Sequence, residues 1–155
     1  MNILKKARSF VRLDKKTKLL LIEAYLYLAW ARYLKSIPFS KVVPSLGKQM
    51  QETSISADLS NKKVLASVSH AIHLMSRYTF WESECLVKAI AGMRMLEKRN
   101  IESTLYLGTA KDEKGELIAH AWLRSGPFYI SGSEVMDRFT VVAKFAKEIR
   151  ANKAG

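Results

Sequence analysis

Hydrophobic and polar positions in the first third of the chain follow a helical period. Over residues 3–12, apolar side chains share one side of a helix and basic side chains share the other. Asp14 is suited to cap a second helix over residues 15–35, which Pro38 ends. Because this second helix is apolar nearly all round, we expect most of it to be buried. The following stretch, residues 38–58, contains two prolines and many polar residues, so we expect a connecting loop.

Two further helices are predicted before residue 100. The first, over residues 60–76, repeats apolar residues along one buried side. The second, over residues 84–99, has a similar apolar side. Ser83 is suited to cap the start of this last helix, and Asn100 is suited to end it in the left-handed conformation.

After residue 100 the period of the pattern changes to two. Alternation predicts strands over residues 103–109, 117–124 and 128–131, with tight turns between them. Residues 140–145 fit either a last strand or the start of a terminal helix. Helices first and an antiparallel sheet afterwards make the predicted fold class α+β.

Length and composition indicate one globular domain. The chain has 155 residues, of which 48% are apolar, enough for a core of its own. Cys85 is the only cysteine, which excludes an intramolecular disulfide and a cysteine-rich zinc site. We expect a cytoplasmic protein, because a lone thiol suits a reducing compartment and no secretory signal is recognisable. Glu23 interrupts the longest apolar stretch, so no membrane-spanning helix is predicted.

The net charge of +12 is concentrated near the N-terminus. Residues 1–50 hold 11 Lys and Arg against 2 acidic residues, a net of +9. Such a basic region suits an anionic partner (nucleic acid, an acidic peptide or a membrane surface), or it is simply a solvated face. Segment 3–12 can lie on anionic lipid, but we expect its apolar side to dock on the second helix, which needs covering. We expect no nucleic acid partner, because no stacking platform or DNA-binding motif is recognisable.

Cys85 and His120 are the candidate catalytic residues. Cys85 falls in the first turn of the last predicted helix, where backbone N–H groups stabilise a thiolate. His120 shares one face of the predicted strand 117–124 with Ile118 and Trp122. If the helix packs on that face, His120 meets the thiol and can act as its general base. On pattern alone, a buried small hydrophobe and a structural histidine remain the alternative interpretation.

Two other histidines have the spacing of metal ligands. His70 and His73 are three positions apart on the predicted helix 60–76. No third ligand is evident in the sequence, so we expect no metal site.

Three stretches of sequence, in this order, resemble a known family. They are residues 81–89 (WESECLVKA), 105–108 (LYLG) and 119–123 (AHAWL). Over residues 78–145 the chain is similar to the transglutaminase-like, papain-related leader peptidases of lasso-peptide biosynthesis. The resemblance implies a papain- or transglutaminase-like core over residues 77–155. Residues 1–76 would then form a basic helical lobe packed on this core, in one compact unit.

The same resemblance implies a function. The protein would be a cysteine peptidase that removes the leader from a lasso-peptide precursor, with Cys85 as nucleophile and His120 as base. A small separate recognition protein would present the leader, and an ATP-dependent cyclase would close the ring. No cofactor is implied for the peptidase. Trp81 and Trp122 would line the substrate cleft, although core aromatics would give the same pattern.

Two other functions stay open at this level. One is an acyltransferase or amidase on the same fold, since both need the same Cys and His. The other is a non-catalytic adaptor in which Cys85 is merely buried.

The group that orients His120 is left open by the sequence. In some members of the family an Asp stands about a dozen residues after the histidine, and here Gly132 stands near that place. Glu134 is our candidate for the third catalytic position. A serine hydroxyl, a backbone carbonyl or a Cys–His dyad without an orienting group are the alternatives.

Overall fold

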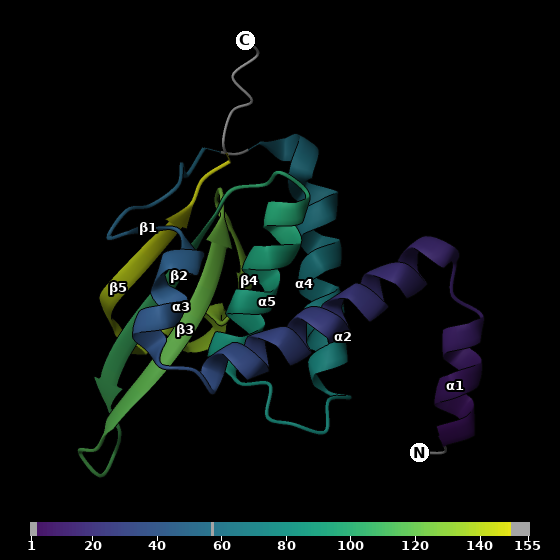
Figure 1. Cartoon of the computed structure of the whole chain (residues 1–155), viewed down its shortest axis with the longest axis horizontal. Coiled ribbons are helices and arrows are strands. Elements are labelled where there is room, and N and C mark those ends of the chain that lie inside the picture. Colours follow the sequence, from purple (N-terminus) through teal and green to yellow (C-terminus); the bar gives the residue numbers. More distant parts are fainter. Residues whose placement is uncertain (1–2, 57, 150–155) are drawn as a thin grey trace.

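Helices cover one face of a five-stranded sheet (Figure 1). The computed structural model describes residues 3–56 and 58–149. All neighbouring strands are antiparallel, in the order β1-β5-β2-β3-β4. The strands are β1 (Lys48–Gln49), β2 (Ser103–Lys111), β3 (Leu117–Ser125), β4 (Phe128–Ser131) and β5 (Thr140–Lys147). The predicted α+β class is therefore confirmed.

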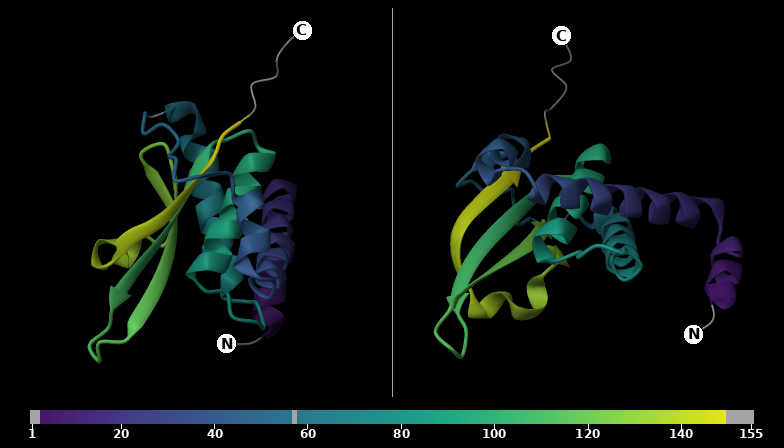
Figure 2. Two further views of the ribbon diagram at one scale, coloured as in Figure 1. Left: turned by 60° about the vertical axis from the view of Figure 1, so that its left-hand side comes forward. Right: turned by 60° about the horizontal axis from the view of Figure 1, so that its bottom comes forward.

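Five α-helices precede or interleave with these strands. They are α1 (Ile3–Val11), α2 (Lys15–Lys35), α3 (Phe39–Leu46), α4 (Lys62–Ser76) and α5 (Cys85–Lys98). Two short 3₁₀ helices, η1 (Leu59–Asn61) and η2 (Ser133–Arg138), complete the described chain. The left view of Figure 2 shows the helical layer on one side of the sheet and η2 on the other.

The main core lies between the helical layer and one face of the sheet. Leu105, Leu123 and Phe145 face the helices from three neighbouring strands and are fully buried. In α5, Gly92 allows close contact, because a Cβ there would lie 2.8 Å from Leu123 Cδ2. Residues 1–76 and residues 77–155 both contribute to this core, since α2 and α4 pack against α5.

A second buried layer occupies the opposite face of the sheet. The rings of Tyr106 and Trp122 stack there, with centroids 5.5 Å apart. Arg124 is buried beside them and donates hydrogen bonds to the carbonyls of Thr53 and Ser54. These bonds hold the segment that follows β1 against the sheet. Burial and a hydrogen bond to Glu52 raise the pKa of Tyr106 to about 12.

Most element boundaries agree with the sequence pattern. The Asp14 carboxylate accepts a hydrogen bond from Thr17 N, as expected for the cap of α2. Asn100 has φ +54° after α5, as expected for a left-handed stop. The three predicted strands are present, and residues 140–145 belong to a strand rather than a helix.

The loop predicted over residues 38–58 is wrong in its first part. Residues Phe39–Leu46 form α3, which contains Pro44, and β1 follows. Val42 and Leu46, one turn apart, are buried in the core. This burial stabilises a two-turn helix that the prolines, judged locally, argued against.

The N-terminal helices are more exposed than expected. In α2 only one stripe is buried, formed by Leu21, Ala24, Leu28 and Ala31. No residue of α1 is buried, and Figure 1 shows α1 set apart from the helical layer. The predictions that most of α2 is buried and that α1 docks its apolar side on α2 are therefore wrong. No helix within residues 3–56 and 58–149 has the length and apolar character needed to cross a bilayer.

Candidate active site

Cys85 is the first residue of α5, and its side chain is half-buried. Ser83 was expected to cap this helix, but its hydroxyl instead hydrogen-bonds Thr79 Oγ1 at 2.8 Å, and the N-cap residue is Glu84. The first backbone bond of the helix runs from Lys88 N to Glu84 O, at 3.0 Å. The N–H groups of residues 85–87 therefore have no acceptor within the helix, and they can stabilise negative charge on the thiol or on a bound oxygen.

An ion pair ties the start of α5 to the end of α2. The Glu84 carboxylate hydrogen-bonds Lys35 Nζ, and this contact lowers the pKa of Glu84. A carboxylate next to the thiol would on its own disfavour a thiolate. Because Lys35 neutralises that carboxylate, the electrostatic cost to a thiolate at Cys85 is reduced.

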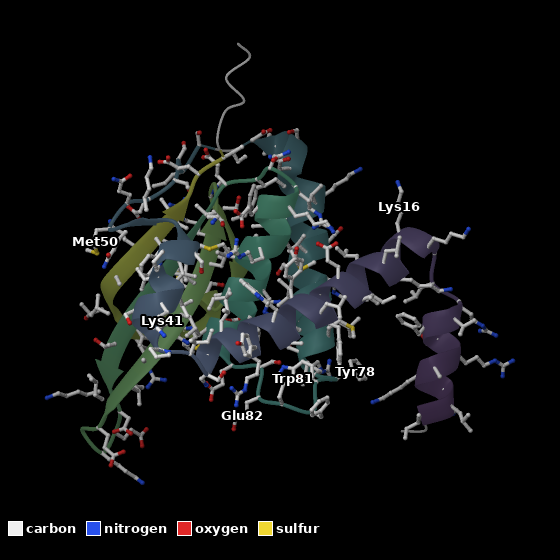
Figure 3. All side chains as sticks on the ribbon, in the orientation of Figure 1. Lys16, Lys41, Met50, Tyr78, Trp81 and Glu82 are labelled. Atoms are coloured by element: carbon white, nitrogen blue, oxygen red, sulfur yellow. The ribbon has the colours of Figure 1, made fainter. Side chains whose placement is uncertain are left out.

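Trp81 lies in the segment that joins α4 to α5. Its ring meets the ring of Tyr25 edge-on, with centroids 5.2 Å apart, and it packs against the helical core as Cys85 does. Figure 3 shows Trp81 with Tyr78 and Glu82 at the end of the helical layer. Trp81 Nε1 is buried and has no hydrogen-bond partner within the described part of the chain.

His120 lies on β3 and is held by a backbone carbonyl. Its Nε2 is 2.7 Å from Gly132 O. Since a carbonyl can only accept, Nε2 carries the proton and Nδ1 presents a free lone pair. The rings of Trp122 and Phe139 lie near it, with centroids 6.0 and 5.0 Å away. In this tautomer His120 can accept a proton at Nδ1, as a general base must.

Glu134, our candidate for the third catalytic position, lies in η2 and is exposed. Its Oε1 is 3.8 Å from His73 Nε2, so the histidine beside Glu134 is His73 of α4. Of the alternatives left open by the sequence, the backbone carbonyl is the one found at His120. A backbone acceptor has no signature in the side-chain sequence, which is why sequence reasoning could not single it out.

Helix α5 packs on the face of β3 opposite to the one that carries His120, so the condition under which His120 would meet the thiol directly is not met. Ala121 and Leu123 face α5, whereas His120 and Trp122 project from the other face. No hydrogen bond between described residues joins Cys85 to His120. β4 pairs with β3 over residues 123–125, and beside His120 the same edge is covered by Gly132 and η2 rather than by a strand.

Two glycines shape the surroundings of His120. Gly132 has φ +78°, and a Cβ there would collide with the Ala121 carbonyl oxygen. Gly108 is the cross-strand partner of His120, and a Cβ there would lie 2.9 Å from the Trp122 ring. Because neither glycine has a side chain, the backbone and the Trp122 ring can pack closely around His120. This role could not be predicted from the sequence.

Within residues 3–56 and 58–149, no three His, Cys, Asp or Glu side chains gather as a metal site would require. His73 Nδ1 bonds the Ser69 carbonyl at 2.7 Å, and His70 is exposed.

Comparison with known families decides the broader class. The model of the family described as "Transglutaminase-like superfamily" matches residues 26–144, from within α2 to within β5. The chain belongs to the transglutaminase-like superfamily. Cysteine-based catalysis is common among transglutaminase-like proteins. Comparisons with curated proteins and with solved structures gave no match.

Proposed function

We propose that this transglutaminase-like protein is a cysteine peptidase that removes the leader from a lasso-peptide precursor. The observation that carries the proposal is the state of His120: Gly132 O holds Nε2, which leaves Nδ1 as a proton acceptor in a chain whose only cysteine begins a helix. The resemblance of residues 81–89 and 119–123 to stand-alone leader peptidases supports the choice of substrate.

The proposed reaction uses groups of this chain alone. His120 Nδ1 takes the Cys85 proton, and Sγ attacks the carbonyl carbon at the leader–core junction. The N–H groups of residues 85–87 stabilise the resulting oxyanion. The C–N bond then breaks, the core leaves as an amine protonated by His120, and the leader remains as a thioester. Water, deprotonated by His120, attacks the thioester and releases the leader as a carboxylate.

The proposal also says which part of the site moves. Gly132 O hydrogen-bonds His120, and the rings of Trp122 and Phe139 lie beside it, so the imidazole is well fixed. The segment before Cys85, residues 77–84, contains no regular secondary structure and carries the exposed Phe80. In the reacting complex this segment and the first turn of α5 bring Sγ to Nδ1.

Partners follow from the same proposal. A small recognition protein presents the leader, and an ATP-dependent cyclase uses the amine that cleavage releases. The reaction takes place in the cytoplasm, where a lone thiol stays reduced.

Mass spectrometry of a candidate precursor, incubated with this protein and its recognition protein, tests the function. We expect cleavage at one junction, with a free carboxylate on the leader. His120→Ala should slow cleavage by about 100-fold or more, whereas His70→Ala, which alters an exposed histidine of α4, should not change the rate. An amine adduct on the leader would identify an acyltransferase instead. An intact precursor with all proteins folded would contradict the peptidase function.

A further inference from the structure

The N-terminal helices carry apolar surface that no part of the described chain covers. In α1, Ile3, Leu4 and Val11 are 83%, 78% and 69% exposed. In α2, Leu19 and Leu26 are 67% and 63% exposed and share a stripe opposite the buried one. Both helices lie on the side of the molecule away from the sheet (Figure 2).

Basic side chains border this apolar surface. At 3.6 residues per turn, Lys6 and Arg8 lie on the two borders of the apolar side of α1, and Lys5 lies behind it. The start of α2 adds Lys15, Lys16 and Lys18. No side chain of α1 takes part in an ion pair with the described residues. Lys6 Nζ lies 4.8 Å from the centroid of the Tyr78 ring, so the charges of Lys5 and Arg8 are the ones available to a partner.

The acidic residues of this region do not offset the charge. Residues 3–35 contain two acids, Asp14 and Glu23. Asp14 bonds Thr17 as the cap of α2, and Glu23 pairs with Arg99. A second copy of this chain would bring the same positive charge to the surface and be repelled, so charge complementarity favours an anionic partner.

We propose that α1 and the first half of α2 bind an anionic lipid surface, with the apolar side of α1 inserted among the headgroups. Apolar residues on one side of a helix and basic residues at the borders of that side are typical of an interfacial helix. A lipid surface needs no matching shape, whereas a nine-residue helix offers far less area than a stable protein interface buries. The sequence had favoured docking on α2, but the structure leaves α1 uncovered.

Flotation of the whole chain with vesicles tests the proposal. We expect binding to phosphatidylcholine vesicles that contain phosphatidylglycerol and little binding to pure phosphatidylcholine. Leu4→Asp should weaken binding by about tenfold or more. Leu117→Asp, at an equally exposed leucine of the β2–β3 hairpin, should leave it unchanged.

Two double variants test whether lipid is attracted to the charges of α1 or to the net charge of the whole protein. Lys5→Gln with Arg8→Gln should weaken binding by about 30-fold. Lys111→Gln with Lys114→Gln removes the same charge from the hairpin and should have little effect. Equal losses in both double variants, or no binding to either vesicle, would overturn the proposal. Binding of a soluble acidic peptide by α1 without any vesicle binding would assign the face to a protein partner instead. None of these outcomes depends on the proposed peptidase activity.

Discussion

A single hydrogen bond determines the proton-transfer role that His120 can take. Gly132 O accepts from Nε2 at 2.7 Å, so in the neutral imidazole Nδ1 is the nitrogen without a proton. The residue types Cys and His, and their order, could be predicted from the sequence. The orienting group could not, because any residue supplies a carbonyl and only the path of the backbone places it.

The dependence on this backbone path leads to a prediction at Gly132. A Cβ there collides with the Ala121 carbonyl, so Gly132→Ala must displace the carbonyl that holds His120. We expect a loss of about 2 kcal/mol or more in the free energy of unfolding, together with slower cleavage of the precursor. Urea unfolding and the mass-spectrometric assay measure the two effects.

Gly115→Ala is the matched control. Gly115 also has φ +78°, but nothing lies within 4 Å of the added Cβ. It should cost about 1 kcal/mol and leave cleavage unchanged. If both variants lost the same stability and kept full activity, the Gly132 carbonyl would have no role in holding the histidine.

At the scale of elements, the sequence predicted the helix ends that depend only on residues close in the chain. The Asp14 cap and the Asn100 stop are both found where the sequence placed them, because capping bonds and a left-handed residue need only near neighbours. Helix α3 and the exposed side of α2 were missed. Their states depend on contacts with residues far along the chain, which periodicity alone does not reveal.

One such long-range contact is the ion pair between α2 and α5. Arg99 donates to both oxygens of Glu23, at 2.6 and 2.9 Å. Burial alone would raise the pKa of Glu23, but the hydrogen bonds and charge of Arg99 lower it below its ordinary value of 4.5. The ionised form therefore stabilises the folded protein above that value, and the stabilisation is lost as the pH falls through the lowered pKa.

Glu23→Gln should reduce the free energy of unfolding by about 1 to 2 kcal/mol at neutral pH, because Arg99 loses its charged partner. The difference from the native protein should shrink as the pH falls through the lowered pKa of Glu23. Urea unfolding at several pH values measures both trends. Glu113→Gln, in the exposed hairpin turn, should show neither. If Glu23→Gln lowered the free energy of unfolding by the same amount at every pH, the charge of Glu23 would not contribute to the stability of the folded protein.

At the scale of the whole molecule, the two candidate catalytic residues come from different layers. Cys85 belongs to the helical layer, and His120 belongs to the aromatic layer on the far face of the sheet. Alternation correctly assigned Ala121 and Leu123 to one face of β3 and His120 and Trp122 to the other. It could not say which face the helix covers, because both faces of this strand are apolar and both are buried near Trp122.

The central claim is that Cys85 is the nucleophile that carries the leader. Mass measurement of the intact protein and of its proteolytic peptides, after acid quenching of a reaction with precursor and recognition protein, tests it most directly. We predict a thioester adduct of leader mass on the peptide that contains Cys85, and neither adduct nor cleavage with Cys85→Ala. Cleavage by a folded Cys85→Ala protein, or an adduct on another residue, would contradict the claim.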